Sequence, residues 1–162
     1  MKPRAVIGID PGKGKSSPGA AVLLTNHFSI EVYDYEDDYT AGIWARAMLK
    51  QYDIRRVFIE QLNADPYWPP KTNFSLGGSY HGWKQMWAFA QIPITVVRPI
   101  KWQKGLFSME DRKQGKDPKQ KSVFYVRREY PGFAPTLAKH LKDHGRCDAF
   151  LIARWGKQQQ DE

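Results

Sequence analysis

Two acidic residues each follow a short apolar segment, at the point where a buried strand would leave the core. Asp10 follows the segment 6–9 and precedes a Pro-Gly turn, and Glu60 follows the segment 57–59. If the two strands are neighbours, their axes lie about 4.8 Å apart, and the two carboxylates meet at one edge of the sheet. Ionised carboxylates so close together repel unless one takes up a proton or a cation lies between them. We therefore predict a site for Mg²⁺ or Mn²⁺, which prefer oxygen ligands. The alternative is that Asp10 only forms the turn and Glu60 is a surface acid at a strand end.

A third candidate comes from the segment 143–153, near the end of the printed sequence. Asp148 precedes the apolar run 149–153 of a predicted helix, and an acid on a core-facing helix is costly unless it is paired. Asp148 could instead be a first-turn acid favoured by the helix dipole. Asp143 could bind a cation or cap the helix, and His144 could be a ligand or a loop histidine.

The alternation of apolar and polar residues predicts the elements that must bring these acids together. Strands are expected at 6–10, 20–25, 28–35, 57–60 and 94–98, and helices at 39–52, 77–91, 118–130 and 146–157. A tight connection at Asn26 and His27 makes the second and third strands an antiparallel hairpin. The strand, helix, strand order up to Glu60 implies a right-handed crossover, with the fourth strand parallel to the first. The segment 61–75 is expected to be a surface loop and 108–117 to be polar and mobile.

The net charge of +8 is concentrated in residues 98–146, which we call the basic segment. It holds 13 Lys or Arg against 5 Asp or Glu, whereas residues 1–97 hold 10 against 9 and residues 147–162 hold 2 against 3. Such a segment is typical of proteins that bind a polyanion, most commonly nucleic acid, although charge runs also serve only for solubility. The candidates for phosphate contacts are Lys101, Lys104, Lys119, Lys121, Arg127 and Arg128. Tyr67 and Trp68 could stack on an unpaired base or pack over the core.

Length and composition predict a single domain over residues 1–162, with enough apolar residues for a core. No apolar run approaches the roughly 18 residues of a membrane span, and the first residues lead into a strand rather than a signal segment. Cys147 is the only cysteine, which excludes an internal disulfide and any multi-cysteine zinc site. We expect a cytoplasmic protein with no membrane contact.

Five blocks of sequence together resemble the RuvC-type Holliday-junction resolvases, and most of all their compact phage or prophage branch. They are Ile-Gly-Ile-Asp-Pro-Gly at 7–12, Phe-Ile-Glu-Gln at 58–61, Phe-Ser-Leu-Gly-Gly-Ser-Tyr-His-Gly-Trp at 74–83, Pro-Ile-Thr-Val-Val-Arg-Pro at 93–99 with Lys-Trp at 101–102, and Asp-His-Gly-Arg-Cys-Asp-Ala-Phe-Leu-Ile-Ala at 143–153. The resemblance implies an α/β, ribonuclease H-like fold, with a five-stranded mixed sheet of three antiparallel and then two parallel strands, flanked by helices. It also implies a homodimeric, metal-dependent endonuclease that nicks Holliday junctions and other branched DNA, in the host cytoplasm if a phage encodes it.

Carried over by position, the resemblance makes Asp10, Glu60 and Asp148 catalytic metal ligands. Family members commonly hold an acid or histidine three residues before the last acid, but that position is Gly145 here. Asp143 and His144 are the available substitutes, and we favour Asp143 because a hard cation prefers oxygen. The family chemistry would use two Mg²⁺ or Mn²⁺ ions, with in-line attack by water that leaves a 5′ phosphate and a 3′ hydroxyl.

Two other functions are open to a chain of this kind. Residues 12–16 suggest a phosphate loop, but the glycine that such a loop needs five positions before Gly14 is replaced by Ile9, so no nucleotide cofactor is expected. The alternative function is a non-catalytic nucleic-acid-binding module on the same fold, with the acids in structural roles. The irregular position of the fourth acid is the feature that favours it.

Overall fold

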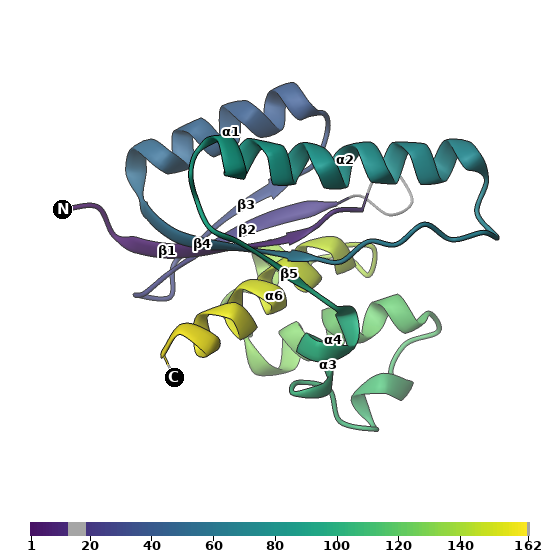
Figure 1. Cartoon of the computed structure of the whole chain (residues 1–162). Coiled ribbons are helices and arrows are strands. Elements are labelled where there is room, and N and C mark those ends of the chain that lie inside the picture. The colour runs from purple at the N-terminus through teal and green to yellow at the C-terminus, as the bar shows by residue number, and fades with distance from the viewer. Residues whose placement is uncertain (13–18, 162) are drawn as a thin grey trace.

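A five-stranded mixed sheet forms the centre of the computed structural model, which describes residues 1–12 and 19–161 (Figure 1). The strands are β1 (Arg4–Asp10), β2 (Ala20–Thr25), β3 (Ile30–Asp34), β4 (Asp53–Glu60) and β5 (Ile94–Val97), in the order β3-β2-β1-β4-β5. β1, β2 and β3 are antiparallel, whereas β4 and β5 run parallel to β1. The predicted fold class, with three antiparallel and then two parallel strands, is confirmed.

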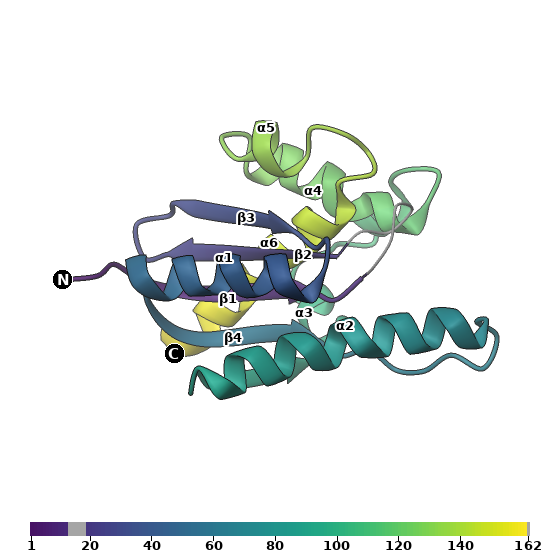
Figure 2. The same cartoon turned by 90° about the horizontal axis from the view of Figure 1, so that it is seen from above.

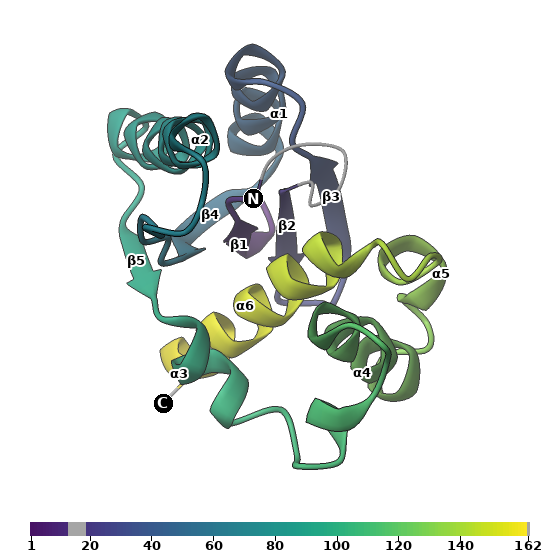
Figure 3. The same ribbon diagram turned by 90° about the vertical axis from the view of Figure 1, so that its right-hand side faces the viewer.

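Helices cover both faces of the sheet, so that the two central strands are buried on both sides (Figure 3). Alternate residues of β1 enter different layers of the core: Ile7 and Ile9 pack with α1 (Asp38–Gln51) and α2 (Pro70–Phe89), whereas Val6 packs with α6 (His144–Asp161). This alternation is the two-residue period of a strand. No helix among residues 1–12 and 19–161 is long and apolar enough to cross a membrane.

The helix α2 begins earlier than the sequence predicted. The segment 61–75 is irregular only as far as Pro69, and Pro70 opens α2, because proline lacks the N–H that the first turn would leave unpaired anyway. Asn73, which falls inside the predicted loop 61–75, lies in the first turns and donates to the carbonyl of Asp65 over 2.9 Å. α1 and α2 lie along the strands, and the first turns of α2 extend beyond the strand ends (Figure 2).

The basic segment folds onto the α6 face of the sheet. It contains α3 (Pro99–Lys104), α4 (Lys121–Glu129), α5 (Ala134–Leu137) and the short 3-10 turns Asp111–Lys113 and Pro118–Gln120. The stretch predicted to be mobile is anchored by Asp111, whose carboxylate accepts bonds from the Ser108 N–H and the Arg128 guanidinium. α3 and α5 were not predicted, because four to six residues show too little periodicity.

The last helix crosses β1 and β4 at two glycines. A Cβ added to Gly8 would lie 2.1 Å from the carbonyl oxygen of Ala149, and one added to Gly156 would lie 2.3 Å from the ring of Phe58. Both distances are far below van der Waals contact, so only glycine permits this approach. It brings the first turns of α6 against the end of β1.

Candidate active site

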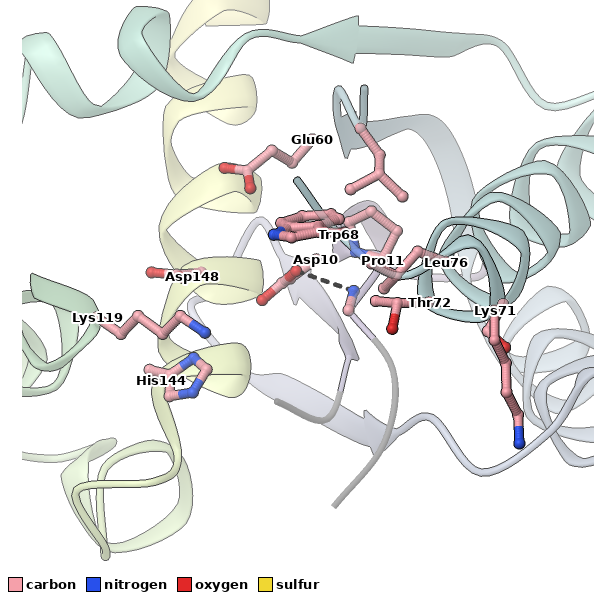
Figure 4. A pocket seen from close by; sticks show the side chains of 13 residues that line it. Asp10, Pro11, Glu60, Trp68, Lys71, Thr72, Leu76, Lys119, His144 and Asp148 are labelled. Carbon is pink, nitrogen blue, oxygen red and sulfur yellow. Dashed lines mark hydrogen bonds between the residues drawn. The ribbon is translucent and has the colours of Figure 1, made fainter. Parts of the chain in front are cut away.

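The three predicted acids line one cavity of about 680 Å³ at the carboxyl ends of β1 and β4 (Figure 4). Asp10 ends β1 and Glu60 ends β4, and the pairing of Ile9 with Ile59 makes the two strands parallel neighbours there. Asp148 joins them from the second turn of α6. The cavity is lined by Asp10, Pro11, Gly12, Glu60, Leu62, Trp68, Lys71, Thr72, Ser75, Leu76, Lys119, His144 and Asp148.

His144, rather than Asp143, is the fourth side chain that faces the acids. One ligand atom from each of Asp10, His144 and Asp148 lies within 4.8 Å of the others. His144 is the first residue of α6, four before Asp148, so both project from one side of the helix. The Asp143 carboxylate instead accepts from the backbone N–H of His140 over 2.8 Å, and Asp143 is not among the described residues that line the cavity.

Burial makes the charged forms of Asp10 and Asp148 costly. It raises the pKa of Asp10 to about 6, although the Gly12 N–H, which donates to Oδ1 over 3.1 Å, and the Lys119 ammonium partly offset this. Burial also raises the pKa of Asp148, and the charges of Asp10 and Glu60 raise it further. A hydrogen bond from Ser122 acts in the opposite direction. The site therefore concentrates negative charge that the protein alone does not neutralise.

Glu60 shares this electrostatic environment but has a donor of its own. Burial, followed by the charge of Asp10, raises the pKa of Glu60 to about 7. The indole N–H of Trp102 donates to Oε2 over 2.7 Å and, together with Lys121, lowers that pKa in part.

The donor set fits a hard divalent cation. Three carboxylates of raised pKa lie in one cavity, and a bound cation would remove both their mutual repulsion and the cost of their burial. Burial and the neighbouring Lys119 lower the pKa of His144, so its imidazole is neutral at neutral pH and has a free lone pair. Asp10, His144 and Asp148, whose ligand atoms lie within 4.8 Å of one another, are the residues that would hold the ion. Glu60 lines the same cavity but lies outside that group.

We expect the metal-free protein to lose stability as the pH rises from about 4 to about 7. The pKa of Asp10 rises on folding from 3.8 to about 6 and that of Glu60 from 4.5 to about 7, so the folded state holds protons that the unfolded state has released. Each carboxylate therefore costs up to about 3 kcal/mol once it is ionised. Thermal unfolding in EDTA across this range measures the loss, and a variant with Asp10→Asn and Glu60→Gln should show a flatter profile. If the stability of the variant and of the wild type depended equally on pH, this would contradict the raised pKa values of Asp10 and Glu60.

One lysine of the basic segment lines the site, and the charge of a second, Lys121, acts on Glu60. Lys119 lines the cavity from the turn Pro118–Gln120, where the Asp117 side chain caps its N–H over 2.9 Å. Lys121 opens α4, donates to Gln103 over 2.9 Å, and lies over the Phe107 ring.

The sequence pattern at 12–16, which we rejected as a phosphate loop, includes residues 13–16, and these lie outside the residues that the structure describes.

The other side chains predicted to contact phosphate differ in how many interactions they already make within the protein. Lys101 lies over the Trp155 ring and Lys104 is exposed, both on α3. The Arg127 guanidinium donates to the carbonyls of Ala138 and Lys139, joining α4 to the residues after α5. Arg128 is bonded to Asp111 and Glu129. Both arginines thus have structural partners, which leaves the lysines as the better candidates for phosphate.

Trp68 and Tyr67, the two candidates for stacking on a base, differ in their place relative to the cavity. Trp68 lines the cavity and is 40% exposed, whereas Tyr67 is 94% exposed and points away from the core. The sequence prediction missed the first turns of α2, which add Lys71, Thr72 and Ser75 to the residues that line the cavity.

The Pro69-Pro70 pair was the available signal, because proline at the first helical position would have placed these residues on a helix.

The fold is shared with solved resolvases. A Thermus thermophilus RuvC in complex with a Holliday junction substrate is 13% identical, with a TM-score of 0.57 over 96% of each chain. Another T. thermophilus RuvC structure is 14% identical, with a TM-score of 0.55 over 96% of each chain. A fowlpox virus resolvase in complex with Holliday junction DNA is 13% identical, with a TM-score of 0.54 over 98% of this chain and 99% of that one. No protein-family model and no curated protein matches the sequence. The ribonuclease H-like fold is thus confirmed.

Proposed function

We propose that this protein is a metal-dependent Holliday-junction resolvase of the RuvC type, an endonuclease that nicks branched DNA. The observation that carries the proposal is the convergence of Asp10, Glu60 and Asp148, from three separate elements, in one cavity that Lys119 borders. The fold shared with two proteins solved on Holliday junction DNA supports the same substrate class.

Bound at this site, one or two Mg²⁺ or Mn²⁺ ions would activate a water for in-line attack and stabilise the leaving 3′ oxygen, giving a 5′ phosphate and a 3′ hydroxyl. The three carboxylates hold that charge in place and, once neutralised by it, admit the DNA phosphate. Lys119 pairs with a phosphate oxygen at the cavity rim. The neutral His144 offers a nitrogen to the ion or to the attacking water.

The fourth position is better filled by His144 than by Asp143. Its ring nitrogen already lies with the oxygens of Asp10 and Asp148, whereas the Asp143 carboxylate is occupied by the His140 N–H. Neutral imidazole is a common metal ligand in proteins. We therefore propose His144 in place of the Asp143 that the sequence favoured.

The remaining features follow from the resemblance and the chemistry. We propose a homodimer, because resolving a junction needs symmetric nicks on two opposed strands and each chain supplies one site. Trp68, at the cavity rim, is the better candidate for stacking on an unpaired base. Membership of the phage or prophage branch and a place in the (host) cytoplasm belong to the same proposal.

Nicking of a synthetic four-way junction, compared with a linear duplex of the same sequence, tests the function. With Mg²⁺ or Mn²⁺ we expect nicks near the crossover that carry a 5′ phosphate, and none in EDTA. Tight junction binding without any nicking in either metal would support the non-catalytic module instead, and the absence of both would reject both functions.

Junction affinity should fall steeply with salt. Each neutralised phosphate contributes about −0.9 to the slope of log affinity against log salt on a duplex. Lys104→Gln and Lys119→Gln should each make this slope shallower by about 0.9, measured by fluorescence anisotropy in Ca²⁺. Lys50→Gln is the control, because Lys50 lies in the last turn of α1, and α1 covers the opposite face of the sheet (Figure 3). An equal change in all three variants would show that only net charge matters.

A further inference from the structure

Trp102 joins the basic segment directly to one of the candidate metal ligands. It lies on α3, which follows β5 after a single residue, and its side chain is 0% exposed. Its indole N–H donates to Oε2 of Glu60 over 2.7 Å. A fully buried indole N–H is costly without an acceptor, so this bond ties the orientation of Glu60 to the position of α3.

The surroundings of Trp102 fix its ring rather than leaving it free to turn. Phe107 packs edge-on against it with ring centroids 5.9 Å apart, and both rings belong to the core layer under α6. Lys121 lies over the Phe107 ring, with its ammonium 5.3 Å from the ring centroid, and bonds to Gln103 next to Trp102. α3 and the start of α4 thus form one packed unit around the Glu60 carboxylate.

We propose that Trp102 is a positioning residue that sets Glu60 for cation binding and couples the cation site to the basic segment. This inference rests on the proposed metal site. An indole N–H donates one bond and carries no charge, so it holds Oε2 without competing electrostatically with a cation, as a lysine or arginine would. Oε1 stays available for the ion. Binding of DNA phosphates along α3 and α4 then stabilises the unit that orients Glu60.

The test compares two tryptophans that are equally buried. Trp87 is 0% exposed, and its indole N–H has no hydrogen-bond partner among the described residues. Trp102→Phe and Trp87→Phe therefore remove the same atoms from the core, but only the first removes a bond to a ligand. We expect Trp102→Phe to weaken Mn²⁺ binding, measured by isothermal titration calorimetry on the folded variants, by about 10-fold or more. Trp87→Phe should stay within about twofold of the wild type, and equal affinities in the two variants would overturn the proposal.

A spectroscopic measurement that keeps Trp102 in place tests the proposal even if Trp102→Phe does not fold. The indole N–H signals in a ¹H–¹⁵N spectrum of the intact protein report their hydrogen bonds. Glu60→Gln should shift one of them, that of Trp102, because the acceptor loses its charge, and Mn²⁺ should broaden the same signal. A Trp102 signal unaffected by both changes would reject the coupling. Neither readout needs nicking, so a protein whose Mn²⁺ affinity depends on Trp102 but which leaves junctions intact would reject only the nuclease function.

Discussion

Asp10→Asn is expected to abolish nicking of a four-way junction while leaving junction binding intact. The amide has nearly the same shape and still accepts the Gly12 N–H, but it removes one of the negative charges that would hold the proposed cation. A catalytic cation contributes several kcal/mol of transition-state stabilisation, and about 1.4 kcal/mol corresponds to a factor of ten, so we expect a loss of at least about 10³-fold. Single-turnover nicking in Mg²⁺ measures the loss, and binding in Ca²⁺ serves as the parallel assay.

The same variant should be more stable than the wild type without metal. Burial raises the pKa of Asp10 to about 6, so its ionised form opposes folding at neutral pH, and a neutral amide removes that cost. Asp143→Asn is the matched control, because Asp143 lies at the same end of the sheet with its carboxylate turned to His140. Retained nicking by Asp10→Asn, or a loss as large in Asp143→Asn, would contradict the site as we describe it.

The convergence of Asp10 and Glu60 could be predicted because strand ends carry strong local signals. An apolar run that ends in an acid marks the edge of a sheet, and the crossover rule makes the two strands parallel neighbours. Asp148 was predictable for a related reason, since an acid beside a buried apolar run needs a partner. These inferences depend on residues close together in the sequence.

The predicted relation of Asp143 and His144 to the other acids depended on where the last helix begins. The predicted helix began at Arg146, which left both residues in a loop, whereas α6 begins at His144. His144 lies four positions before Asp148, a spacing that places both on one side of a helix. Helix ends are the least reliable part of such predictions, and an error of two residues left His144 outside the predicted helix.

Long-range contacts between individual side chains could not be predicted where no repeating pattern marks the element that carries them. The bond from Trp102 to Glu60 spans 42 residues and depends on α3, which is too short to have a period. Arg127 and Arg128 counted as phosphate contacts by charge, but their acceptors, Ala138 and Asp111, are fixed by the packing of α4. Charge in a sequence locates a binding segment, but only the fold shows which cations are free.

Gly8→Ala is expected to disrupt the site from the core. The added methyl group would lie 2.1 Å from the Ala149 carbonyl oxygen and 2.4 Å from the Ala153 nitrogen, both in the backbone of α6. Backbone cannot turn aside as a flexible side chain does, so α6 must move away from β1. We expect a loss of about 3 kcal/mol or more in the free energy of unfolding, at the upper end for overpacked cores. Urea unfolding of the metal-free protein measures it.

Gly42→Ala is the matched control, because Gly42 lies inside α1 and nothing comes within 4 Å of an added Cβ. Alanine should stabilise that helix by roughly 0.5 to 1 kcal/mol. If Gly8→Ala folds, α6 carries Asp148 away from Asp10, and a displacement of about 1 Å costs about 10²-fold in nicking rate. Its affinity for Mn²⁺ should fall as well, since His144 moves with Asp148 on the same helix. A Gly8→Ala protein as stable and active as Gly42→Ala would mean that the close crossing of α6 over β1 does not set the distance between the acids.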